Sequence, residues 1–210
     1  LFLMASSHLF GFIAKGDVGP LTAWIDELDR GNTTDTRQIW GARGDGLFVL
    51  DNGFTTKANL WAGAGEGAKI FQVAGAIGWS IPISPILCTC IFGGISYGYY
   101  TSDITLFDQK FDKDIRSVSP NFGCDVTVKL YEGLRATGSV QYAFATAWTK
   151  IPKLVDKVSH SEGPTYSVLI ENDFNEYLSL NIAAAYNISL SKKKLGLRAT
   201  GLKAGIAYWF

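Results

Sequence analysis

The chain has 210 residues, 19 basic and 19 acidic side chains, and a charged fraction of 18%. This length suits one barrel or sandwich domain, and the interleaving of basic with acidic residues argues against a nucleic-acid-binding surface. No run of about eighteen apolar residues occurs, which argues against a transmembrane helix.

The first segment, residues 1–14, is apolar and is expected to be either a first strand or the remnant of a secretory signal peptide. Residues 15–36 are expected to form an outer loop, because a strand at residues 1–14 would run outward and close against the C-terminal strand. Within this loop, residues 20–29 predict a short amphipathic helix that starts near Pro20 and ends near Gly31. The residues that share its apolar stripe are Leu21, Trp24, Ile25 and Leu28.

From Gln38 onward, apolar residues alternate with polar or small ones, the pattern of strands that face lipid on one side. The last segment reads LKAGIAYWF and ends on Phe210, which is typical of a transmembrane β-barrel. Nine such segments are predicted, at residues 38–50, 54–64, 71–81, 86–101, 122–130, 134–148, 166–171, 178–188 and 202–210.

The connections between these segments alternate in length. Tight turns are predicted at residues 51–53, 82–85, 131–133 and 173–176, with Asp51-Asn52-Gly53 the strongest hairpin signal. Long, charged loops are predicted at residues 102–118 and 149–162. Outer-membrane barrels keep short turns on the periplasmic side and long loops outside, so the C-terminus is expected on the periplasmic side.

These features predict an all-β fold, a closed antiparallel up-and-down transmembrane barrel formed by a single domain, residues 1–210. Only helices and closed barrels satisfy every backbone hydrogen bond in lipid. Because single-chain bacterial barrels usually have an even number of strands, a tenth strand is expected at residues 1–14, with eight strands as the alternative.

The polar face of the alternating segments predicts the lining of the lumen. These side chains are expected either to pair with one another in a packed interior or to line a solvated path that sets ion preference. The predicted lumen-lining residues are Arg43, Asp45, Lys57, Asn59, Gln72, Asp125, Lys129, Arg135, Gln141, Glu171, Asn181 and Lys203.

Aromatic residues near the strand ends predict two interfacial girdles, because amphipathic rings prefer the boundary between lipid and water. Trp61 is expected in the outer girdle beside Trp40. The predicted membrane-anchoring residues are Trp40, Trp79, Tyr97, Trp148, Tyr166, Tyr208 and Phe210.

Catalysis and metal binding have little support in the sequence. Residues 159–162 contain serine, histidine and glutamate, but consecutive residues cannot converge on one substrate atom, so a lipid-modifying hydrolase centred on His160 is the weakest alternative. Cys88, Cys90 and Cys124 are expected to be small packing residues, with intermolecular disulfides as the alternative. We expect no cofactor, no metal and no enzymatic activity.

The chain resembles small bacterial outer-membrane barrels through its alternation and its closing Ala207-Tyr208-Trp209-Phe210. A short stretch is also similar to the chlamydial major outer membrane protein family, through Leu130-Tyr131-Glu132, residues 137–143 (TGSVQYA) and Ile151-Pro152-Lys153. That second resemblance implies a porin-like, cysteine-rich protein.

The sequence therefore predicts an integral protein of the bacterial outer membrane with a structural or weakly porin-like role. The alternative is a surface adhesin that contacts host or envelope proteins through residues 102–118 and 149–162. The expected partners are outer-membrane lipid and the barrel-assembly machinery, which would recognise the C-terminal strand; no nucleic-acid partner is expected.

Overall fold

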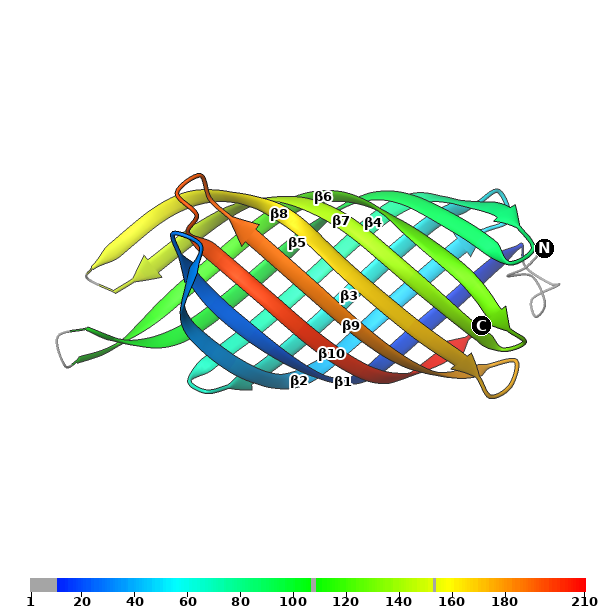
Figure 1. Cartoon of the computed structure of the whole chain (residues 1–210), viewed down its shortest axis with the longest axis horizontal. Helices are drawn as coiled ribbons and strands as arrows, with labels where there is room; N and C mark the ends of the chain where they lie inside the picture. The colour runs from blue at the N-terminus through cyan, green and yellow to red at the C-terminus, as the bar shows by residue number, and fades with distance from the viewer. Residues whose placement is uncertain (1–10, 107–108, 153) are drawn as a thin grey trace.

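The computed structural model describes residues 11–106, 109–152 and 154–210, which form a closed antiparallel barrel of ten strands (Figure 1). Each strand pairs with the next along the chain, and β1 closes the barrel against β10. The strands are β1 Phe12–Asp29, β2 Asn32–Leu50, β3 Phe54–Gly65, β4 Ala68–Ser84, β5 Leu87–Leu106, β6 Gln109–Tyr131, β7 Leu134–Ile151, β8 Val155–Asp173, β9 Leu178–Leu190 and β10 Gly196–Trp209. The predicted fold class is confirmed, with ten strands rather than eight.

The first strand differs from its prediction. It runs over Phe12–Asp29, so the expected loop at residues 15–36 is instead most of β1 and the start of β2, and the expected helix at residues 20–29 is wrong. This segment hydrogen-bonds on both sides, to β10 from Lys15 to Leu28 and to β2 over its whole length. Pairing on two edges gives each backbone group a partner that an isolated helical turn on a loop would not have. Residues 1–10 of the predicted first strand lie outside the described residues.

The predicted long loops are also strands. β5 and β6 pair as far as Leu106 and Gln109, and β7 and β8 pair as far as Ile151 and Val155. The neighbouring strand β4 ends earlier: its pairing with β5 extends only to Ser102. The two hairpins therefore project beyond the barrel wall at one end, opposite the end where the N- and C-termini lie (Figure 1).

The opposite end carries short turns, as predicted. Gly53 closes the turn between β2 and β3 with a positive φ of 88°, a conformation that glycine adopts without steric cost, and its N–H donates to the carbonyl of Leu50 at 2.8 Å. Pro82 lies within β4 rather than ending it, where it faces Cys88 beside a register irregularity. An irregular register tolerates a residue without an N–H.

The strand registers fix which side chains face the lumen. Inward positions are the even residues of β4 and β5 and the odd residues of the other strands. Outward positions carry exposed apolar side chains around the barrel, among them Ile77, Val140, Ile182 and Ile206, each more than half exposed. A soluble monomer rarely exposes apolar patches of such extent, so this belt is the surface that contacts hydrocarbon. The protein is a membrane-spanning β-barrel of the outer-membrane type.

Candidate functional site

The barrel encloses a cavity of about 1590 Å³. Its lining includes Gly53 and Glu176 at the short-turn end and Asp29 and Lys192 at the end with the projecting hairpins. The lining of this cavity therefore extends to both rims, and the inward-facing side chains determine what can enter it.

A first group of ion pairs lies midway along β1, β2 and β10. Asp17 and Asp45 are direct cross-strand neighbours, a placement that is unfavourable for two like charges. Lys203 from β10 contacts both carboxylates, with its Nζ 2.7 Å from Asp45 Oδ2. Arg43 donates to Asp45 Oδ1 from Nη2 at 2.7 Å and from Nε at 2.8 Å. The two cations thus balance the two acids across the β1–β10 junction.

A second group lies nearer the short-turn rim. Glu171 on β8 is 2% exposed and accepts from Lys15 on β1 and from Arg135 on β7, the latter at 2.8 Å. Arg135 also pairs with Asp173. Trp209 contacts both cations with its ring, whose centroid is 5.0 Å from Lys15 Nζ and 4.4 Å from Arg135 Cζ. This arrangement joins β1, β7, β8 and β10 across the lumen.

A third pair crosses the lumen from β3 to β6. Lys57 contacts Asp125, which also accepts from Ser139 Oγ at 2.6 Å. The Lys57 ammonium lies 4.0 Å from the ring centroid of Phe92. An added Cβ at Gly123 would meet that ring at 2.7 Å, so glycine leaves the space that Phe92 occupies.

Eleven of the twelve predicted lumen residues line the cavity, the exception being Asn181. Asn181 is 2% exposed, and neither of its amide atoms has a hydrogen-bond partner among the described residues. Its cross-strand neighbours are Glu171 and Gly205, which place it between the first and second groups of ion pairs.

Sequence reasoning missed Lys15, Asp17 and Glu27, because it treated residues 15–36 as a loop. The alternation of Ile13, Lys15 and Asp17 with small or apolar residues was the signal that could have found the first two. Further toward the outer rim, Glu27 accepts from Lys113 at 2.5 Å, from Ser102 at 3.2 Å and from Tyr100 at 3.5 Å.

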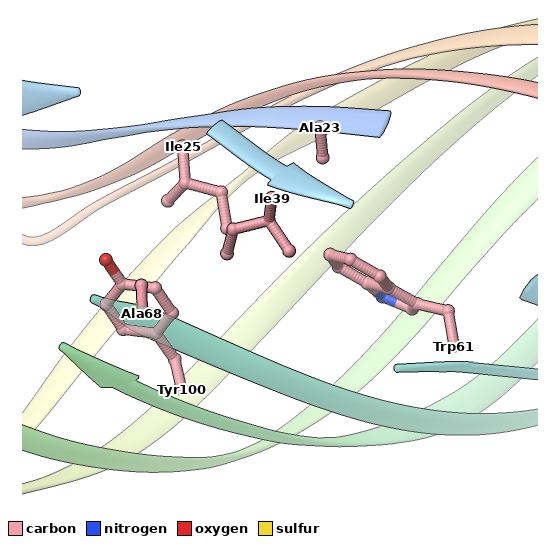
Figure 2. Packing of buried hydrophobic residues seen from close by; sticks show 6 residues of the cluster. All are labelled: Ala23, Ile25, Ile39, Trp61, Ala68 and Tyr100. Atoms are coloured by element: carbon pink, nitrogen blue, oxygen red, sulfur yellow. The ribbon is translucent and has the colours of Figure 1, made fainter. Parts of the chain in front are cut away.

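The lumen near the projecting hairpins is lined on one side by apolar residues (Figure 2). The buried members come from β1 to β5 and point toward one another across this curved part of the wall. They are Ala23, Ile25, Ile39, Trp61, Ala68 and Tyr100. The residues that pack against them and stay partly exposed are Leu21, Ile70, Ile115, Leu197 and Ala199.

Trp61 belongs to this cluster and not to the outer girdle, where it was predicted. It shares the inward face with Lys57 and Asn59, is 9% exposed, and donates its indole N–H to Gln72 Oε1 at 2.6 Å. A girdle position would need the opposite face of β3. The seven residues predicted as membrane anchors are all exposed on the outer surface: Trp40, Trp79, Tyr97, Trp148, Tyr166, Tyr208 and Phe210.

The described residues around His160 and around the three cysteines do not assemble into a catalytic or metal site. His160 lies on β8 with Nδ1 3.2 Å from Thr146 Oγ1 on β7, while Ser159 and Ser161 line the cavity from the alternate face. Cys88 and Cys90 line the cavity and Cys124 faces outward beside Ile91, and all three are free thiols. Among the residues that the structure describes, no histidine, cysteine and carboxylate side chains gather as a metal site, and no helix is long and apolar enough to cross a membrane.

Comparison with known proteins supports the fold alone. The translocator domain of the autotransporter NalP from Neisseria meningitidis aligns over 97% of this chain and 90% of its own, with a TM-score of 0.52 and 11% identity. Neisserial surface protein A aligns over 94% and 96% (TM-score 0.49, 12% identity), and Ail, the attachment invasion locus protein of Yersinia pestis, over 96% and 100% (TM-score 0.47, 10% identity). No protein-family model and no curated protein sequence matches the chain. The chain has the fold of outer-membrane β-barrels, and the local chlamydial resemblance stays a prediction.

Proposed function

We propose that the protein is a narrow outer-membrane passage for small solutes. The observation that carries this proposal is the cavity of about 1590 Å³ whose lining reaches both rims. Small barrels otherwise tend to fill their interior with side chains. The space here exists because the inner faces of β7 and β9 carry small residues, among them Ala143, Ala145, Ala183 and Ala185.

The ion pairs support a low throughput and weak charge selectivity. Lys57 and Asp125 meet across the lumen, and Lys203 is shared by two aspartates, so side chains occupy part of the cross-section. Rings of unpaired charge select ions in pores, whereas these charges neutralise one another. We expect small conductances that differ little between cations and anions.

Planar-bilayer conductance with a pair of tryptophan variants on β9 tests the passage. Ala185 faces the lumen, whereas Ala184, the residue before it, is exposed on the outward face that it shares with Ile182 and Tyr186. A185W should lower the single-channel conductance at least twofold, because the ring enters the open side of the lumen, while A184W should leave it unchanged. A folded wild-type barrel without conductance, or equal conductance in both variants, would reject the proposal.

A second candidate function, surface attachment, is favoured by the projecting hairpins. Their tips expose apolar side chains beyond the level of the anchor residue Trp148, including Leu154 (48%) and Val155 (38%). Replacing residues 104–111 and 152–157 by tight turns should abolish attachment to host cells and leave conductance intact. Unchanged attachment would reject an adhesive role for these hairpins.

We further propose that the strand ending on Phe210 is the segment that the barrel-assembly machinery recognises. Tyr208 and Phe210 stand together on its outer face, with ring centroids 4.7 Å apart.

A further inference from the structure

The outer half of the lumen has two unlike walls at the same height. One wall, the apolar arc, runs from β10 through β1 to β6; its partly exposed residues are Leu21, Ile70, Ile115 and Leu197, and Ile25 and Trp61 are buried among them. The other wall, the small arc, belongs to β7, β8 and β9 and presents Ala145, Ala147, Ser159, Ser161 and Ser189. Because β1 to β5 and β7 to β9 lie on opposite sides of the closed strand order, the two arcs face each other.

The strand registers join the arcs into one ring. Leu197 pairs directly with Ser189, which connects the arcs between β10 and β9. On the other side, Tyr100 of β5 pairs with Ile115 of β6. Ser117, two residues along β6, pairs with Ala147 of β7, which in turn pairs with Ser159 of β8. The space between the arcs is therefore bounded by bulky apolar groups on one side and by methyl and hydroxyl groups on the other.

This ring departs from the polar interior expected of a membrane barrel. Apolar surface that faces a water-filled lumen is unfavourable, and it becomes favourable once an apolar solute covers it. The residues named in the two arcs carry no charge. Of the charged side chains that line the cavity at their edges, Glu27 is met by Lys113, Ser102 and Tyr100, and Lys157 lies two residues beyond Ser159 toward the hairpin tip. A charged solute between the arcs would lose its hydration without a directly facing counter-ion.

We propose that the outer half of the lumen binds a small uncharged molecule with an apolar body and a hydroxyl-like group. Its apolar body packs against the apolar arc, and its polar group exchanges hydrogen bonds with the serines of the small arc. The cavity is large enough for such a ligand, because small-molecule sites usually occupy about 300–1,000 Å³. This inference rests on the proposed passage in one respect, since it names the class of solute that the outer mouth admits.

The test is equilibrium dialysis of 2-naphthol against the full chain in lipid nanodiscs, with empty nanodiscs as the reference for partition into lipid. We expect saturable excess binding with one site per barrel. 2-Naphthalenesulfonate, which has the same rings and a fixed charge, should bind at least tenfold more weakly. No excess over empty nanodiscs, or equal binding of the sulfonate, would overturn the proposal.

Two variants on β7 locate the site. A147W fills the space between the arcs and should weaken naphthol binding at least tenfold, while T146W places the same ring on the outward face and should leave binding unchanged. S161F fills the same arc from β8 and serves if A147W does not fold, as judged by heat-dependent gel mobility. Binding that both lumen-filling variants leave intact would contradict the assigned position. Because binding is measured without transport, a barrel that binds naphthol and conducts nothing contradicts the passage alone.

Discussion

The two halves of the lumen are held together by different interactions. Toward the short-turn rim, the interior is held by paired charges such as Glu171 with Lys15 and Arg135. Toward the projecting hairpins, it is held by apolar contacts such as those of Ile25, Ile39 and Tyr100. Both halves use the same inward positions of the same strands, so the difference lies in the side chains and not in the backbone.

The difference teaches how each half responds to substitution. A buried ion pair adds little net stability but makes the loss of one partner severe, because an uncompensated charge remains. An apolar cluster loses stability in proportion to the contacts removed. Removing a single charge in the inner half should therefore lower the free energy of unfolding sharply, whereas in the outer half the loss should grow with the number of apolar contacts removed.

The largest effect is expected for Lys203→Met. Lys203 is 6% exposed and contacts both Asp17 and Asp45, so its removal leaves two neighbouring carboxylates, of which Asp45 keeps its ion pair with Arg43. We expect a loss of about 3–5 kcal/mol in unfolding free energy, measured by urea titration in lipid vesicles. Lys193→Met at the exposed rim is the control, and equal stability of the two variants would contradict this account.

Glu171→Gln should have the next largest effect. The amide keeps the shape of the carboxylate but loses the charge that meets Lys15 and Arg135. Charge-assisted hydrogen bonds contribute about 1.5–3 kcal/mol, and a loss of this size is expected in the same titration. The double variant in which Lys15→Met accompanies Glu171→Gln should lose less than the sum of the single changes; strict additivity would show that the pair is not coupled.

Ile39→Val tests the graded response of the outer half. Ile39 is 1% exposed within the apolar cluster, and removal of one methylene should cost about 0.5–1.5 kcal/mol. Ile77→Val, on the lipid-facing side of β4, is the matched control and should cost less, because lipid fills the space that the side chain vacates. A larger loss at Ile77 would mean that the cluster is not packed.

The smallest effect is expected for Arg198→Ala at the outer rim. Arg198, whose side chain is 37% exposed, pairs with Asp26 at 2.5 Å. Exposed ion pairs gain little because water and salt screen them, so urea titration should show no measurable change. A clear loss of unfolding free energy would contradict this expectation and would show that ion pairs at the rim contribute as those of the inner half do.

The sequence predicted the fold where the two faces of a strand differ. In β9, Leu178, Leu180 and Ile182 face outward while Ser179 and Asn181 face inward, and the alternation is plain. Arg43, Asp45, Arg135, Glu171 and Lys203 of the inner half followed from the same contrast, because charge inside and apolar groups outside produce a clear period of two. Lys15 and Asp17 were missed, because their segment was taken for a loop.

The prediction failed where both faces are apolar. In β1, Leu21, Ala23 and Ile25 line the lumen while Trp24 points outward, so the period of two disappears and Leu21, Trp24, Ile25 and Leu28 imitate a helical stripe. The same property hid the apolar arc. Trp61 was misplaced for another reason, because it was assigned to the girdle as an aromatic residue near a strand end although it shares its face with Lys57 and Asn59. The projecting hairpins were taken for loops because solvent surrounds both of their faces and no alternation is required there.

The seam between β1 and β10 sets the order in which this barrel can form. Every other pairing of the described strands joins neighbours along the chain, whereas the seam joins Asp17 to Lys203, 186 positions apart. Bringing such distant segments together carries the largest chain-entropy cost, so closure is the natural last step of folding. A chain halted before it would be a curved sheet with two bare edges, competent to join a second copy. Folding of the single barrel and edge-to-edge aggregation thus diverge at this one junction.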